Sequence, residues 1–288
     1  MTDPFLAHRS LLFTVAYEML GSAADAEDVV QETWLRWADA DQSEVRDPRA
    51  YLVRIVTRQS LNRLRTLARR REDYVGEWLP EPLLTTPDVS DDVELAESVS
   101  MAMLTVLETL TPTERAVFVL REVFDVPYEE IAAALDKSAA AIRQTAHRAR
   151  EHVAARRPRR QVDRSEQQRV VERFLAALST GDVQGLIDVL APDVVVVADG
   201  GGLVAAARHP ITGATKVVAF LSKFATLATT AVVDTVWLND ALGGRIVLDG
   251  KLNTVISFVI DDGRISRMYA VRNPNKLGRL NEEAVIAR

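Results

Sequence analysis

The residues best suited to chemistry in this 288-residue chain are basic side chains gathered in two separate segments. Residues 54–71 contain seven arginines and no acidic residue, and residues 137–160 contain eight basic residues against Glu151 alone. Basic groups neutralise phosphates, and guanidinium or amide groups form paired hydrogen bonds with base edges. The two segments therefore indicate a nucleic-acid partner, although the net charge of the whole chain is −6.

The second basic segment lies on the last helix of an expected helix-turn-helix over residues 113–153. Ile142, Ala146, Ala149 and Val153 fall on one face of that helix and are expected to pack inward. The opposite face is expected to read duplex DNA in the major groove or to contact its phosphates, through Arg143, Gln144, His147, Arg148 and Arg150. The alternative interpretation is a basic helix of a bundle that only faces solvent.

The first basic segment lies on a helix expected over residues 49–71, with aromatic residues nearby in the sequence. Cations for the backbone and planar groups for unstacked bases are the combination that binds single-stranded DNA. The apolar face through Val30 predicts that Trp34 lies in the core and that Trp37 is more open. The residues expected to contact separated strands are Trp37, Tyr51, Arg54, Arg58, Asn62, Arg63 and Arg65.

Three parts of the chain are expected to hold these residues. The first is helical, over residues 5–20, 24–38 and 49–71, and a linker with Pro80, Pro82 and Pro87 follows it. Further helices are expected over 93–110, 111–123, 127–135 and 138–157. From Ser165 two helices precede β-branched runs, which predicts an α+β domain with a curved, mostly antiparallel sheet. Its expected strands are 194–197, 203–208, 231–238, 245–248, 254–260 and 265–271, with a helix over 215–228 among them.

Composition excludes several classes of protein. The chain has no cysteine, so it has no disulfide framework, thiol nucleophile or thiolate zinc site, and its four histidines lack metal-ligand spacing. No apolar run approaches the roughly 18 residues of a membrane span. Residues 1–10 do not resemble a secretory signal. We therefore expect a cytoplasmic protein with no metal, cofactor or membrane association.

Taken together, these segments resemble the extracytoplasmic-function group of bacterial RNA polymerase sigma factors. Residues 49–55 (RAYLVRI) and 61–65 (LNRLR) match the segment that reads the melted minus-ten promoter element, except that Arg58 stands where many members have Asn. The helix-turn-helix matches the module for the minus-thirty-five element. Residues 25–34 (DAEDVVQETW) match the acidic helix that faces the β′ clamp of core RNA polymerase, which implies contacts by Asp25, Glu27, Asp28, Gln31 and Glu32.

The C-terminal part resembles that of the subgroup with a fused SnoaL-like domain, in which the extension regulates the sigma part in place of a separate anti-sigma protein. The matching motifs are WLPEPL at 78–83, DGGG at 199–202 and NPNKL at 273–277. Asn275 replaces the usual Asp, and Leu203 stands where Lys commonly follows the glycines. The implied regulatory residues are Trp78, Leu79, Pro80, Glu81, Pro82, Asp199, Gly200, Gly201, Gly202, Asn273, Pro274 and Lys276.

The expected organisation is multidomain, with two all-α domains, the second a helix-turn-helix, followed by an α+β SnoaL-like cone. The expected boundaries are 1–75 for the region-2 domain, 76–95 for an acidic Pro-rich linker, 96–160 for the region-4 domain and 161–288 for the regulatory domain. The acidic stretch 72–112 suits passage through a positively lined polymerase channel, as linkers in the family do, the alternative being a linker that only faces solvent.

We expect a sigma factor that binds core polymerase and promoter DNA, directs initiation and is regulated in cis. The alternative is a SnoaL-like enzyme or small-molecule sensor fused to a DNA-binding module. Acid–base candidates in the last domain are Asp199, His209 and Asp234, but their spacing forms no paired constellation. We therefore expect no catalytic residues there, and a pocket for a small-molecule effector rather than an active site.

Overall fold

The computed structural model describes residues 3–72, 74–86, 93–156, 163–227 and 231–288. The chain forms two compact units, and each is described by itself. The helical unit comprises residues 1–72, 89–157 and 284–288. The C-terminal unit comprises residues 73–88 and 158–283, so most of the linker belongs to it.

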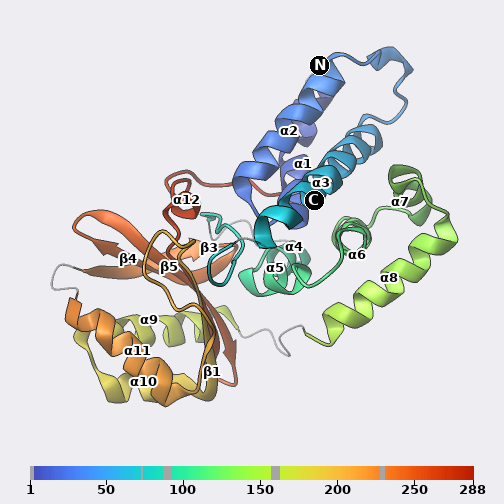
Figure 1. Ribbon diagram of the computed structural model, residues 1–288. Helices are drawn as coiled ribbons and strands as arrows, with labels where there is room; N and C mark the ends of the chain where they lie inside the picture. The colour runs from blue at the N-terminus through green and yellow to red at the C-terminus, as the bar shows by residue number, and fades with distance from the viewer. Residues whose placement is uncertain (1–2, 73, 87–92, 157–162, 228–230) are drawn as a thin grey trace. The chain divides into compact units, whose positions relative to one another are not determined.

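The helical unit begins with α1 (Pro4–Leu20), α2 (Ala23–Ala38) and α3 (Pro48–Glu72), with a short turn η1 (Gln42–Glu44) before α3 (Figure 1). Helix α1 packs against both α2 and α3 and is buried from Leu11 to Leu20. Gly21 ends α1 in the left-handed conformation, and the Ser22 hydroxyl caps α2 by accepting from the amide of Asp25.

The rest of the unit contains α4 (Val93–Ser98), α5 (Met101–Leu107), α6 (Pro112–Phe118), η3 (Val119–Val123), α7 (Tyr128–Leu135) and α8 (Ala139–Ala154). A single helix over 93–110 was the wrong prediction. Ser100 instead caps α5 by accepting from the amide of Met103. Thr111 and Glu114 form a reciprocal capping box that starts α6. The predicted inward face of α8 is confirmed, since Ile142, Ala146, Ala149 and Val153 are all buried.

The C-terminal unit combines a six-stranded sheet with helices that pack against it (Figure 1). Its elements are α9 (Arg164–Thr180), α10 (Val183–Val189), β1 (Leu190–Asp199), β2 (Ile211–Thr212), α11 (Ala214–Leu227), β3 (Val232–Leu238), β4 (Ala241–Leu248), β5 (Lys251–Asp261), β6 (Arg264–Val271) and α12 (Pro274–Leu277). The strand order is β2-β1-β6-β5-β4-β3. Only the β1–β6 pair among these is parallel, which confirms the mostly antiparallel α+β class.

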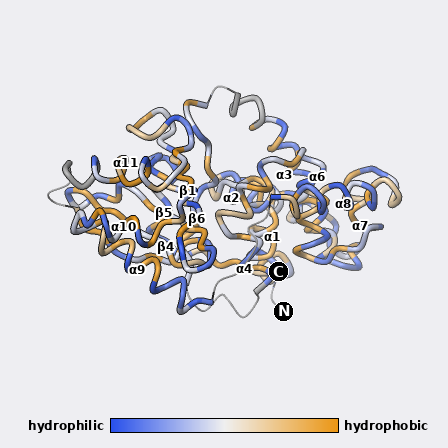
Figure 2. Tube along the Cα trace, turned by 90° about the horizontal axis from the view of Figure 1, so that it is seen from below, coloured by the Kyte–Doolittle hydropathy of each residue, from blue (hydrophilic) through white to orange (hydrophobic). Residues whose placement is uncertain are grey.

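Apolar faces of α9, α10 and α11 meet the sheet in one core. Phe174 of α9 is fully buried, with its ring 5.2 Å from that of Phe258 on β5 in an edge-on arrangement. Figure 2 shows hydrophobic and hydrophilic residues alternating along α9 and α10, as amphipathic helices require. These helices therefore hold the sheet that carries Asp199 at the end of β1.

The strand predicted over residues 203–208 is wrong. Gly201 and Gly202 have φ values of 62° and 71°, and the amides of Leu203 and Val204 both donate to the carbonyl of Gly200. The chain therefore turns back on itself directly after β1 and cannot continue extended. The apolar run that suggested a strand is largely exposed, with Leu203 at 60%.

The last five residues of the chain belong to the helical unit. Ile286 is buried, and the amide of Ala287 donates to the hydroxyl of Thr14 on α1 at 3.0 Å. The Arg288 guanidinium pairs with Glu94 on α4. The tail thus joins the first helix of this unit to the first helix after the linker. In the described part of the chain, none of the helices has the length and apolarity to span a membrane.

Candidate linker-binding site and nucleic-acid interface

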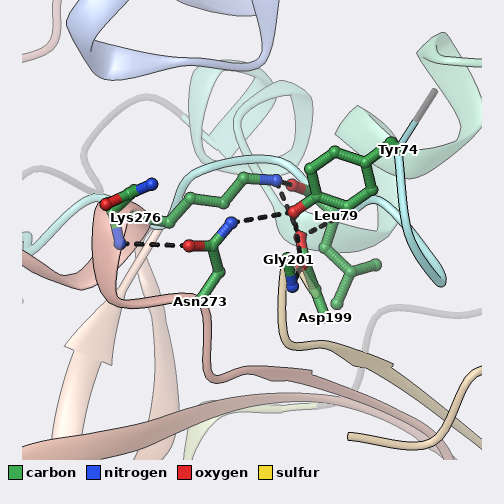
Figure 3. A network of polar contacts seen from close by, with 7 residues as sticks. Tyr74, Leu79, Asp199, Gly201, Asn273 and Lys276 are labelled. Carbon is green, nitrogen blue, oxygen red and sulfur yellow. Dashed lines mark hydrogen bonds and ion pairs between the residues drawn. The ribbon is translucent and has the colours of Figure 1, made fainter. Parts of the chain in front are cut away.

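The carboxylate of Asp199 is fully buried at the end of β1 and holds four donors (Figure 3). One oxygen accepts from the hydroxyl of Tyr74 at 2.6 Å and from the amide of Gly201 at 3.0 Å. The other accepts from the amide of Leu79 at 3.0 Å and from the ammonium of Lys276 at 2.7 Å. Both oxygens are thus satisfied, as a buried charge requires.

Three segments distant in sequence therefore meet at Asp199. Lys276 also donates to the carbonyl of Leu79, and its ammonium lies 4.1 Å from the ring centroid of Trp78. Asn273 caps α12 by accepting from the amide of Asn275 and donates through its side chain to the Tyr74 hydroxyl at 2.8 Å. Burial, and then the bond to Asp199, raise the pKa of Tyr74 above its usual value, which keeps the phenol a donor.

The glycines after Asp199 are required by close packing. A Cβ at Gly201 would lie 2.3 Å from the side-chain nitrogen of Asn273, and one at Gly200 would lie 2.5 Å from the carbonyl oxygen of Val204. A Cβ at Gly202 would lie 3.0 Å from Val75 on the linker. The DGGG motif is thus a close-approach surface for the linker and α12.

The linker continues along the edge strand of the sheet. Leu83 exchanges two hydrogen bonds with Asn239, at 3.1 and 3.0 Å, and the amide of Thr85 donates to the carbonyl of Trp237 at 3.1 Å. Because β3 is the edge strand, this pairing extends the sheet with linker backbone, a known mode of peptide binding. Leu79 and Leu83 are buried at 1% and 4% exposure.

Sequence reasoning missed Tyr74, Thr85 and the Asn239–Asp240 turn in this site. Both turn residues have positive φ, 53° and 59°, which Asn and Asp tolerate. An Asn-Asp pair between two β-branched runs is a hairpin signal that marks this turn. The amide of Asp240 donates to the Thr85 hydroxyl at 2.9 Å.

The Asp240 carboxylate is buried without a hydrogen-bond partner among the described residues, and the Arg164 guanidinium lies 3.8 Å away. Burial raises the pKa of Asp240 to about 6, against the smaller opposing effect of Arg164. Asp240 is therefore a titratable group on a turn whose backbone contacts the docked linker.

The acidic residues of α2 are paired within the helical unit. The Arg63 guanidinium donates to Asp25 at 2.7 Å and to Asp28 at 2.9 Å, although the sequence placed Arg63 at DNA. Arg9 pairs with Glu27, and Gln59 donates to Glu32 at 3.2 Å. Asp28, Gln31 and Glu32 are exposed, so α2 presents an acidic face.

The expectations for the two tryptophans are wrong. Trp37 is buried, at 2% exposure, and its ring contacts Tyr51, whereas Trp34 is 43% exposed. The buried stripe of α2 runs through Thr33, whose hydroxyl donates to the carbonyl of Val29. A polar residue with its own partner thus takes the place that the apolar pattern gave to Trp34.

The remaining basic residues lie on the two expected helices. On α3, Arg54, Arg58, Asn62 and Arg65 are exposed, and Tyr51 is half-buried with the Arg54 guanidinium over its ring. Arg58 donates to the backbone of α7. On α8 the exposed residues are Arg143, Gln144, His147, Arg148 and Arg150, as predicted. Three of them have acidic partners within the unit, since Arg143 faces Glu129, His147 faces Glu151 and Arg150 faces Glu122.

The acid–base candidates do not assemble into a site. The carboxylate of Asp199 is occupied by its four donors, and Asp234 on β3 forms a two-bond pair with Arg245 at 2.8 and 2.6 Å. Three strands separate β1 from β3, so the two carboxylates lie on strands roughly 19 Å apart. His209 lies in the exposed segment after the glycines.

Two helical segments of the chain match models of known protein families. Residues 5–70 match the model of sigma-70 region 2, and residues 100–153 match that of sigma-70 region 4. These two regions define the class of the RNA polymerase sigma factors.

Relatives that align over nearly the whole chain define the group of sigma factors more closely. The extracytoplasmic-function (ECF) RNA polymerase sigma factor SigJ of Mycobacterium tuberculosis is 37% identical over 286 residues, covering 94% of this chain and 91% of the relative. The probable ECF sigma factor SigI of the same species is 31% identical over 96% of this chain and 94% of its own. The crystal structure of SigJ matches with a TM-score of 0.76 and 35% identity, covering 95% of this chain and 96% of that one.

The chain belongs to the ECF RNA polymerase sigma factors, whose role is promoter-specific initiation of transcription. Because the relatives align over nearly the whole length, the C-terminal unit is part of the resemblance, which confirms the predicted subgroup with a fused C-terminal domain.

Substitution of Lys276 by Met should undock the linker. The buried carboxylate of Asp199 would lose its charged partner, which costs about 3–5 kcal/mol for a buried pair. We expect much faster amide hydrogen exchange at Leu79 and Leu83. Lys251→Met, which replaces an exposed lysine of the same unit, is the control. Unchanged exchange in K276M would contradict the role of the ion pair.

The C-terminal unit should gain stability as the pH falls through about 6. The pKa of Asp240 is raised in the folded state, so folding is favoured where this carboxyl is protonated, and the gain is lost as pH rises through 6. Asp240→Asn should remove this dependence and raise the unfolding free energy at pH 7 by about 1–2 kcal/mol. Urea unfolding from pH 4.5 to 8 tests this. Asp249→Asn, in an exposed turn with φ 50°, is the control, and parallel pH profiles for D240N and the wild type would refute the assignment.

Proposed function

We propose that the C-terminal unit regulates this sigma factor by holding the linker between its two sigma regions. The observation that carries this is the buried network of Asp199, which engages Tyr74 just before the linker and Leu79 within it. A linker that is docked there cannot also run through a polymerase channel. Trp78, Leu79, Pro80, Glu81 and Pro82 would bind, and Asp199, Gly200, Gly201, Gly202, Asn273, Pro274 and Lys276 would receive them.

The same proposal assigns a role to each of the four expected segments of the chain. Residues 1–75 would bind polymerase and the minus-ten element, 76–95 would link, 96–160 would bind the minus-thirty-five element and 161–288 would regulate. The assignment of residues 74–86 to the C-terminal unit supports a regulator that acts on the linker itself. Residues 87–92 lie outside the described part of the chain.

The contact with core polymerase would use the acidic face of α2. Asp28, Gln31 and Glu32 are exposed there, and Asp25 and Glu27 are half-buried beside them. A face of carboxylates favours a basic counterpart, which fits the β′ clamp that the family resemblance implies.

Promoter contacts would come from the exposed groups of α3 and α8. On α3 these are Arg54, Arg58, Asn62 and Arg65 with Tyr51, while Trp37 would support Tyr51 from the core. Arg63 would reach DNA only after leaving Asp25 and Asp28. On α8, Arg143 and Gln144 would read base edges, and His147, Arg148 and Arg150 would position the helix on the groove.

The proposed regulator acts by binding rather than by catalysis. Its candidate acids are paired or occupied, which supports a non-enzymatic role. A small-molecule effector would fit a hollow of about 150 Å³ beside the docking site, lined by Val75, Gly76 and residues 204–208. An effector there would shift the linker equilibrium by contacting Val75 and Gly76.

Charge reversal on α2 should weaken assembly with polymerase. The double variant Asp28→Lys, Glu32→Lys would place cations against a basic surface, and we expect binding at least about tenfold weaker. Co-purification with core polymerase measures this. Asp39→Lys with Glu44→Lys makes the same charge change at exposed acids outside the acidic face. Equal binding by both double variants would contradict the assignment of this face.

Release of the linker should raise transcription. In promoter-specific run-off assays with core polymerase, K276M should give several-fold more transcript than the wild type, because its linker no longer has to leave the buried site. Lys251→Met should behave as the wild type. Equal transcript from K276M, once its exchange at Leu79 shows an undocked linker, would refute regulation through the linker.

A further inference from the structure

Arg58 joins two parts of the helical unit that are 75 to 78 positions apart in the sequence. From α3 in region 2, its Nε donates to the carbonyl of Ala134 at 2.8 Å. Its Nη2 donates to the carbonyl of Ala133 at 3.0 Å and to the carboxylate of Asp136 at 2.9 Å. All three acceptors lie at the end of α7, the helix that precedes the turn of the helix-turn-helix.

The end of α7 is suited to receive a guanidinium. The carbonyls of the last helical turn lack partners within the helix and carry its negative dipole end. Asp136 closes the helix in the left-handed conformation, with φ 53°, and adds a negative charge beside those carbonyls. A guanidinium offers several donors in a fixed fork, which the side chain of Asn cannot match. The arginine that departs from the family pattern thus has a structural partner in region 4.

This contact belongs to a packed interface within the unit. Helix α3 packs against α6 as well as α7. Beside it, buried Arg115 of α6 donates to the carbonyl of Glu18 on α1 at 2.8 Å, and Ser98 donates to the Glu18 carboxyl at 2.6 Å. Burial raises the pKa of Glu18 to about 8, so this carboxyl is mostly protonated at neutral pH. Region 2 and region 4 are therefore joined through buried polar groups as well as at Arg58.

We infer that region 4 is an intramolecular competitor for the promoter-reading surface of region 2, with Arg58 as the latch. This inference rests on the proposed contact of Arg58 with the minus-ten element. While Nε and Nη2 are bonded to α7, they are not available to a base or a phosphate. A paired contact of Nε and Nη2 with DNA therefore requires α7 to leave α3, and the latch couples separation of the two regions to that contact.

The separation of the two regions can be measured directly by fluorescence. The chain has no cysteine, so Asp39→Cys, directly after α2, and Glu130→Cys, on α7, provide unique labelling sites, both exposed. Energy transfer between dyes at these sites reports the ratio of open to closed full-length protein, without polymerase or DNA.

Arg58→Ala should raise the open-to-closed ratio by about tenfold, because hydrogen bonds from a charged group are lost. Asp136→Asn should raise it about two- to threefold, since it removes the charge and keeps a residue that tolerates positive φ. Arg65→Ala is the matched control, because Arg65 is an exposed arginine of the same helix that bonds Asn62 on that helix. Ratios for R58A and D136N equal to that of the wild type would overturn the latch.

A second measurement separates the latch from the proposed DNA contact. Binding of a minus-ten single strand by the assembled holoenzyme should weaken in R58A and stay unchanged in D136N, which lacks only a region 4 charge. Open R58A with undiminished strand binding would keep the latch and overturn the DNA contact. Weakened strand binding in an R58A that remains closed would keep the DNA contact and overturn the latch.

Discussion

The buried carboxylate of Asp199 constrains the whole C-terminal unit. An ionised group without water needs partners, and its four donors come from the linker, from the turn after β1 and from α12. None of these segments satisfies the carboxylate alone, so their positions depend on one another. The three glycines follow from the same constraint, because side chains at Gly200 and Gly201 would collide with neighbouring atoms. The linker is thus part of the fold of this unit rather than a tether outside it.

Charged residues are also paired internally in the helical unit. Residues expected to meet external partners already hold internal ones: Arg63 binds two acids of α2, Arg58 binds the end of α7, and Arg150 faces Glu122. Breaking each such pair costs free energy, and this cost makes a non-specific contact with DNA less favourable. The net charge of −6 adds to this, since distant phosphates meet an overall repulsive chain. In the proposed function these charges must exchange their internal partners before they contact DNA, which would favour DNA binding by the assembled polymerase.

Local sequence patterns predicted the structural features that depend on residues close by in the sequence. The inward face of α8 was read correctly because helical periodicity is short-range. Predictions failed where a distant partner decides the outcome. Trp37 lies in the core, where its ring contacts Tyr51 of α3 and its indole nitrogen donates to Asp3, 34 positions away, while Trp34 is exposed. The motifs around Asp199 and Lys276 were recognised through resemblance, but their ion pair spans 77 positions and no local pattern reveals it.

The linker is joined covalently at both ends, to α3 and to α4, while its middle binds the sheet of the C-terminal unit. A separate anti-sigma protein must find its target by diffusion, so its effect depends on how much of each protein is present. Return of this linker to Asp199 is a first-order event within one molecule. Its occupancy is therefore independent of expression level, and in the proposed regulation every copy of the chain would carry its regulator at a ratio of one to one.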